Sequence, residues 1–214
     1  RKARKMLDEA GWTECTITVS NSLDEYLIQD LWMQDARIDA FGVGERLITA
    51  KSEPVFGCVY KLVAVEDKDG NIVPKIKISE NVGKITTPHF KKLYRFYGRD
   101  TGKAIADYLT VYDETVDDSQ NLEIFDPDAT WKRKEVYHFE ARELLVPIYQ
   151  KGKLVYKRPG IEEIKKYCAE QVDTLWDEVK RFDNPHNYYV DLSQKLYDIK
   201  TELLNEKNER YEKN

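Results

Sequence analysis

Residues 38–49 have the sequence IDAFGVGERLIT, which combines a strand pattern, a turn with two glycines and the start of a helix. Gly42 and Gly44 allow the backbone to turn sharply and allow a ligand to approach it closely. A helix expected from Glu45 to about Lys51 would direct free N–H groups and the positive end of its dipole toward this turn. The pattern suits a phosphate, and an ordinary turn of the chain gives the same pattern.

A second polar turn follows the preceding predicted strand, Cys15–Ser20, whose β-branched residues favour extended structure. The turn consists of Ser20, Asn21 and Ser22, and Ser22 with Glu25 fits a capping box for the next helix. In parallel α/β folds, ligands bind at the carboxyl ends of the strands. Both turns would therefore present polar groups to one spot. The alternative is that Ser22 and Glu25 do no more than cap a helix.

Residues 1–52 read as helix, strand, helix, strand, helix, with Gly11 ending the first helix. Repeated strand–helix units indicate parallel strands. An eight-stranded α/β barrel needs about 250 residues, and this region supplies roughly two of its units. The chain starts without Met or an N-cap residue. We therefore expect it to begin within a helix of a larger protein, with the rest of any barrel upstream of Arg1.

The middle of the chain changes to an antiparallel β pattern, in which Asp69-Gly70 and Lys151-Gly152 are hairpin turn signals. The predicted hairpins join 59–65 to 72–78, 93–97 to 104–112 and 146–149 to 154–156, with one more strand at 135–139. The last part is helical. An apolar stripe runs over 161–179, Asn184-Pro185 breaks it, and Asp191 is the expected cap of a final helix.

The fold class expected is thus α/β locally and α+β overall, in three ranges. Residues 1–55 form the terminal βα units of an incomplete α/β barrel, residues 56–158 the antiparallel β-hairpin region, and residues 159–214 the C-terminal helical segment. No internal repeat beyond the βα units is present.

Composition excludes several classes of protein. The net charge of −5 argues against general nucleic-acid binding, and no apolar run approaches the roughly 20 residues needed to cross a membrane. Cys15, Cys58 and Cys168 are odd in number and far apart, so neither a disulfide framework nor a zinc site is indicated. We expect each to be buried or half-buried, in a reduced, cytoplasmic compartment.

Five stretches resemble nicotinate phosphoribosyltransferases of the longer bacterial type, specifically their C-terminal part. They are SNSLDEYLIQDL, ARIDAFGVGERLITAKSEPVFGCVYKLVAVED, KIKISENVGKITTPHFKKLYRFY, GKLVYKRPGIEEIKKYCAEQVDTLWDEVKRF and NPHNYYVDLSQKLYDIK. The resemblance covers essentially the whole chain. The GVG segment followed by VYKLV is its most specific part.

The resemblance implies an enzyme that makes nicotinate mononucleotide from nicotinate and 5-phosphoribosyl 1-pyrophosphate with ATP and Mg²⁺, in NAD biosynthesis. It implies the end of a type II phosphoribosyltransferase-like α/β barrel and a homodimer whose subunits share active sites. The phosphate-binding residues it implies are Ser20, Asn21, Ser22, Gly42, Val43, Gly44 and Arg46. Arg46 is equally compatible with a structural role.

The chain also departs from the family pattern. The family's phosphorylated histidine lies in a Gly-Thr-x-Ala-His segment, and none of His89, His138 and His186 matches it. The family's ribose-binding Asp-Ser-Gly-Asp segment is missing as well. Many relatives have threonine at the position of Glu45, and since a carboxylate repels a phosphate, we expect Glu45 to point away. The sequence predicts part of a phosphate site, no catalytic residue, no bound cofactor and no activity alone; the alternative is a non-catalytic structural or subunit-contact module.

Overall fold

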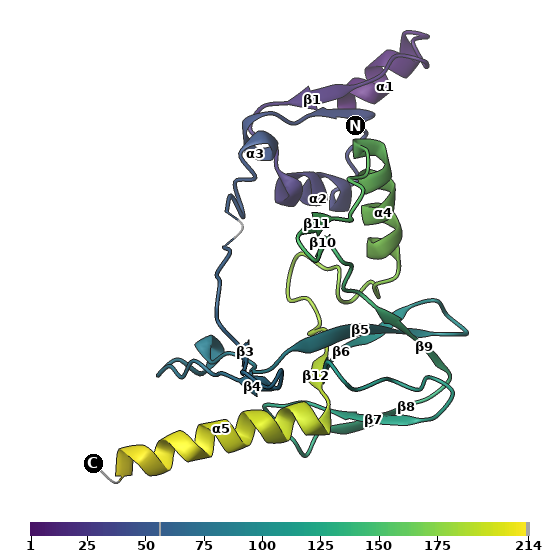
Figure 1. Ribbon diagram of the computed structural model, residues 1–214. Coiled ribbons are helices and arrows are strands. Elements are labelled where there is room, and N and C mark those ends of the chain that lie inside the picture. Colours follow the sequence, from purple (N-terminus) through teal and green to yellow (C-terminus); the bar gives the residue numbers. More distant parts are fainter. Residues whose placement is uncertain (56, 213–214) are drawn as a thin grey trace. The chain divides into compact units, whose positions relative to one another are not determined.

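The computed structural model describes residues 1–55 and 57–212, with side chains described up to residue 206. The chain divides into two compact units, residues 1–60 and residues 61–214. Figure 1 labels their helices and strands. The architecture is mixed α+β, as the sequence predicts.

The first unit alternates helices and strands in the predicted order. Its elements are α1 (Lys2–Glu9), β1 (Thr18–Ser20), α2 (Glu25–Met33), β2 (Ala40–Gly42) and α3 (Glu45–Ile48). The two strands pair in parallel, as expected, although each has three residues and is shorter than its sequence pattern indicates. The unit therefore contains a two-stranded parallel sheet with a helix after each strand.

All three helices of this unit end in the same way. In each, the residue after the C-cap adopts a left-handed conformation: Gly11 (φ 84°), Asp35 (φ 56°) and Ala50 (φ 45°). Two backbone hydrogen bonds then close the last turn, as in a Schellman motif. Gly11 was predicted to end its helix, and the structure confirms it. The other two helices end without glycine, and of their two residues Ala50 is the one that rarely adopts this conformation.

The second unit is built around one four-stranded sheet in the order β12-β6-β5-β9. Its strands are β12 (Val190–Leu192), β6 (Ala104–Val111), β5 (Lys91–Gly98) and β9 (Phe139–Glu143). Hairpins are formed by β3 (Ala64–Glu66) with β4 (Ile72–Pro74), β7 (Leu122–Phe125) with β8 (Arg133–Val136), and β10 (Tyr149–Gln150) with β11 (Lys153–Leu154). The remaining elements are a 3₁₀ turn (Val82–Lys84), α4 (Ile161–Asp173) and α5 (Gln194–Glu212).

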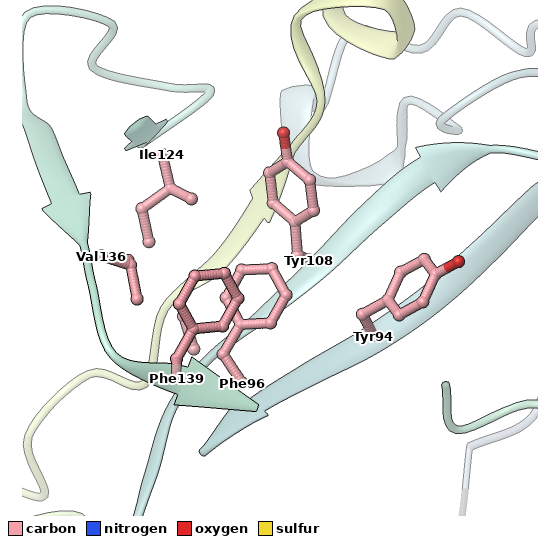
Figure 2. Packing of buried hydrophobic residues seen from close by; sticks show 7 residues of the cluster. Tyr94, Phe96, Tyr108, Ile124, Val136 and Phe139 are labelled. Atoms are coloured by element: carbon pink, nitrogen blue, oxygen red, sulfur yellow. The ribbon is translucent and has the colours of Figure 1, made fainter. Parts of the chain in front are cut away.

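The core of this unit lies between the sheet and the β7–β8 hairpin (Figure 2). Phe96 and Phe139 are fully buried, with ring centroids 4.7 Å apart, and the Tyr108 ring lies 5.4 Å from that of Phe96. Ile124 and Val136 come from the hairpin and pack against them. Since side chains of a strand alternate between its faces, Tyr94 and Phe96 enter this core whereas Arg95 does not.

Arg95 makes a bidentate ion pair with Asp107, its neighbour on β6. Arg95 Nε and Nη2 donate to the two carboxylate oxygens at 2.7 and 2.9 Å. The hydroxyl of Tyr188 donates to the same carboxylate at 3.1 Å. Asp107 is thus a buried charge whose oxygens accept three hydrogen bonds, the condition under which such a group is tolerated inside a protein.

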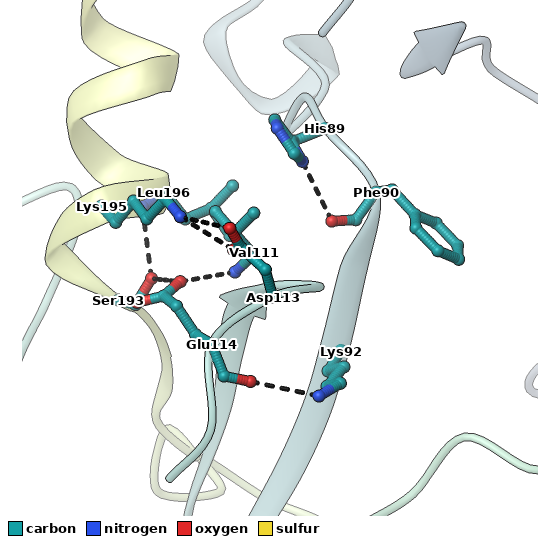
Figure 3. Close-up of polar contacts among 9 residues, drawn as sticks. All are labelled: His89, Phe90, Lys92, Val111, Asp113, Glu114, Ser193, Lys195 and Leu196. Atoms are coloured by element: carbon teal, nitrogen blue, oxygen red, sulfur yellow. Dashed lines mark hydrogen bonds and ion pairs between the residues drawn. The ribbon is translucent and has the colours of Figure 1, made fainter. Parts of the chain in front are cut away.

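The start of α5 corrects one prediction. Asp191 is not the cap, because it lies within β12; Ser193 Oγ instead accepts the Leu196 N–H at 3.2 Å (Figure 3). Ser193 also donates to Glu114 at 2.7 Å, and the same Glu114 oxygen accepts the Val111 N–H. Glu114 therefore ties the end of β6 to the start of α5.

The cysteines correct another expectation. Cys15, Cys58 and Cys168 are free and exposed rather than buried. In the described part of the chain, no helix combines the length and apolar character needed to span a membrane.

Asp191 gives the stability of this unit a pH dependence. The residue is 3% exposed, and burial together with Asp126 raises the pKa of its carboxyl from 3.8 to about 6. The unfolded chain loses this proton first as the pH rises, so the residue's contribution to stability falls between about pH 4 and pH 6 and stays low above it. We expect Asp191→Asn to raise the free energy of unfolding at pH 7.5 by on the order of 2 kcal/mol, and by much less at pH 4.5.

Urea denaturation of wild type and variant at both pH values measures this difference. The exposed Asp198, changed to Asn, is the matched control and should give no such dependence. An equal effect of Asp191→Asn at both pH values would contradict the assignment.

Candidate phosphate site

The two polar turns meet at one end of the two-stranded sheet. In the parallel register Ser20 pairs with Gly42, so the segments that follow both strands leave the sheet side by side. Between them lies a pocket of about 480 Å³. The residues that line it are Asn21, Ser22, Leu23, Gly42, Gly44, Glu45, Arg46 and Lys51.

Gly42 lies where the two strands approach each other closely. A Cβ atom added at this position would lie 3.1 Å from the Cβ of Ser20, closer than nearly all such contacts in proteins. Asn21 and Ser22 turn the chain away from β1 with positive φ angles of 98° and 51°. A side chain at position 42 would be crowded by Ser20, and glycine leaves the backbone accessible at the strand end.

The helix α2 is capped by Asp24, and the predicted capping box is wrong. An N-cap residue needs extended backbone angles, which Asp24 has (φ −140°) and Ser22, at φ 51°, does not. Asp24 Oδ1 accepts the Leu27 N–H at 2.9 Å. Ser22 therefore does not cap the helix, and it lines the pocket instead.

Asp24 also holds Arg46. Its second carboxylate oxygen forms an ion pair with Arg46 Nη1, and both side chains are partly buried. The hydrogen bond from Leu27, and then the hydrogen bond and charge of Arg46, lower the pKa of the Asp24 carboxyl. Arg46 consequently faces the pocket with its charge already paired.

Most of the residues predicted from sequence come together here. Asn21, Ser22, Gly42, Gly44 and Arg46 all line the pocket, and Ser20 adjoins it through its pairing with Gly42. Val43, which is half-buried, is not among the lining residues.

Glu45 is also among the lining residues, and the direction of its carboxylate stays a prediction.

Leu23 and Lys51 line the pocket without having been predicted, and Lys51 is the charged one of the two. It reaches the pocket because α3 has only four residues and ends in a Schellman motif, in which Lys51 N–H donates to Arg46 O and Ala50 N–H to Leu47 O, both at 3.1 Å. The usual signal for such a turn is glycine at the position of Ala50. Because position 50 is alanine and not glycine, the sequence did not indicate that the chain turns back there and brings Lys51 to the pocket.

The three histidines lie in the second unit. His138 Nε2 is 3.1 Å from Asp100 Oδ1, and His138 and His186 both line a separate cavity of about 540 Å³. His89 contacts the carbonyl of its neighbour Phe90. Among the described residues, no group of three or more His, Cys, Asp or Glu side chains is placed to hold a metal ion.

Comparison with known proteins gives one family. Residues 90–200 match the family model described as "Nicotinate phosphoribosyltransferase C-terminal domain". A nicotinate phosphoribosyltransferase of Bacillus subtilis (strain 168) is 44% identical over 212 residues, which are 99% of this chain and 43% of that protein. One from Caenorhabditis elegans is 36% identical, over 85% of this chain and 32% of that protein.

A solved structure agrees at the level of the fold. The crystal structure of human nicotinic acid phosphoribosyltransferase matches with a TM-score of 0.65 at 22% identity, over 94% of this chain and 36% of that one. The chain thus spans less than half the length of the relatives it matches.

Proposed function

Because this chain belongs to the nicotinate phosphoribosyltransferase family, we propose that it is the C-terminal part of an enzyme that makes nicotinate mononucleotide. The substrates of that reaction are nicotinate and 5-phosphoribosyl 1-pyrophosphate, with ATP. In that reaction, this chain binds the 5′-phosphate of the substrate or product in the pocket between the two turns.

The observation that carries the proposal is the meeting of the turns at Asn21 and at Gly42–Gly44 around one pocket. Asn21, Ser22 and Arg46 provide polar side chains there, and Gly44 provides backbone without a side chain. A phosphate is an anion whose oxygens accept hydrogen bonds from N–H, O–H and guanidinium groups. Binding the phosphate in one place would position the ribose carbon that reacts. This contribution lowers the activation barrier by orienting the substrate, without taking part in bond making or breaking.

The first unit has the features expected of the end of a larger parallel barrel. Parallel sheets are normally covered on both faces, and a two-stranded sheet alone is marginal in water. The unit also exposes large apolar side chains, among them Trp32 (66%), Met33 (78%) and Ile48 (85%). We propose that further βα units, supplied by an upstream segment of the same polypeptide, complete the barrel.

The groups that perform the chemistry are proposed to lie in that upstream segment. The first unit contains no histidine, and the three histidines of the second unit do not match the family's phosphorylated one. We assign no catalytic residue, no ATP site and no Mg²⁺ ligand to this chain. The homodimer and the cytoplasmic compartment stay part of the proposal for the whole enzyme.

The reaction assay tests the proposal directly. We expect the longer polypeptide to form nicotinate mononucleotide from nicotinate, 5-phosphoribosyl 1-pyrophosphate and Mg-ATP, and this chain alone to form none. Turnover by this chain at a rate comparable with the longer protein would refute the claim that it is incomplete. A longer protein without activity would refute the assigned reaction.

A crystal soak tests the site itself. With phosphate or nicotinate mononucleotide, we expect an anion beside the N–H groups of Val43 and Gly44, in the longer protein above all because its barrel would be complete. Absence of the anion at saturating ligand would favour a non-catalytic structural module whose glycine segment is only a turn.

A further inference from the structure

The charges around the pocket do not all have partners. Arg46 forms an ion pair with Asp24. In the described part of the chain, no carboxylate lies within ion-pair distance of the Lys51 ammonium group, whose charge acts on Asp24 from farther away. Of the two cations that line the pocket, Lys51 is therefore the one whose charge is not already matched.

The backbone turn at the end of α3 sets the position of Lys51. Ala50 adopts a left-handed conformation that is unfavourable for a non-glycine residue. The two Schellman hydrogen bonds compensate by satisfying the last carbonyls of α3. The residue that follows is turned back toward the strand ends instead of continuing away from them.

Glu45 is an acidic residue among those that line the pocket. With Asp24, Glu45, Arg46 and Lys51 counted together, the acidic and basic side chains at the pocket balance. Without Lys51 the balance would be negative, and the pocket would repel a phosphate dianion.

We propose that Lys51 binds the phosphate of the substrate, offsetting the charge of Glu45, while Asp24 keeps Arg46 in a fixed position beside it. This inference rests on the proposed function and adds a residue outside the set implied by family resemblance. Lysine is suited to the role because its ammonium is a compact charge on a flexible stem and binds phosphate oxygens as a point charge.

The test is steady-state kinetics of the longer protein. For Lys51→Met we expect the KM for 5-phosphoribosyl 1-pyrophosphate to rise about tenfold, as for loss of one charge-assisted hydrogen bond, with the KM for nicotinate unchanged. Lys51→Arg should stay within about threefold of wild type because the charge is kept. Glu45→Gln should lower the same KM.

Two further variants make the result decisive. Lys2→Met removes an exposed lysine of α1 outside the pocket and should leave all constants unchanged. Gly42→Val disrupts the meeting of the strand ends and should raise the KM for 5-phosphoribosyl 1-pyrophosphate whatever the role of Lys51. If Gly42→Val impairs this KM and Lys51→Met behaves like Lys2→Met, the role of Lys51 is overturned and the phosphate site stands. If neither Gly42→Val nor Lys51→Met changes it, the site itself is wrong.

Discussion

Replacing Arg95 with methionine should lower the free energy of unfolding of the second unit by about 3 kcal/mol, because it leaves the Asp107 carboxylate buried without its cation. Methionine preserves much of the side-chain volume, so lost packing contributes little. The remaining partner of the carboxylate would be the Tyr188 hydroxyl, which is a weaker, neutral donor. Urea denaturation followed by circular dichroism measures the difference.

Two controls distinguish the cost of an unpaired buried charge from the cost of losing an arginine side chain. Arg133→Met breaks the exposed pair with Glu123 and should cost no more than about 1 kcal/mol. Adding Asp107→Asn to Arg95→Met removes the stranded charge and should recover more than about 1 kcal/mol of the loss. A double variant no more stable than Arg95→Met would show that the cost does not arise from an unpaired carboxylate.

Truncating Phe139 to alanine should destabilise the second unit by about 3–5 kcal/mol, the cost of a large cavity in a core. Phe139 is fully buried and touches the ring of Phe96, so β9, β5 and the hairpin would all lose packing at once. Thermal or urea denaturation at pH 7.5 gives the value.

The exposed Trp131 provides the comparison, since Trp131→Ala removes an even larger aromatic group from a position that is 78% exposed. Its expected cost is below about 0.5 kcal/mol. Similar losses for Trp131→Ala and Phe139→Ala would mean that the Phe96–Phe139 contact is not the centre of the core.

The sequence predicted the order of elements in the first unit and the meeting of its two turns, because strand–turn–helix units leave few alternatives. It did not predict which residue would cap α2. Ser22 and Asp24 both have capping side chains, and the choice was made by the backbone, since the left-handed angles of Asn21 and Ser22 after β1 place Asp24 at the helix start. Local residue preferences do not contain that information.

The elements missed in the second unit have a different cause. The strand β12 has three residues and depends on its pairing with β6, so no local sequence pattern predicts it. Asp191 was consequently interpreted as a helix cap. The hairpin strand β7, of four residues, was missed as well, although Ile124 and Phe125 are deeply buried. Lys51 was missed because Ala50 adopts a conformation that sequence reasoning reserves for glycine or asparagine.

The place of β12 has a consequence for synthesis on the ribosome. Val190 pairs with Asp107, which precedes it by 83 residues, and Tyr189 supplies the carbonyl that accepts the Asp107 N–H. The sheet of the second unit therefore cannot be completed until β12 has left the exit tunnel, and such distant pairings form slowly. During that interval the β12 side of β6 is an unpaired strand edge, the kind of surface through which strands mispair.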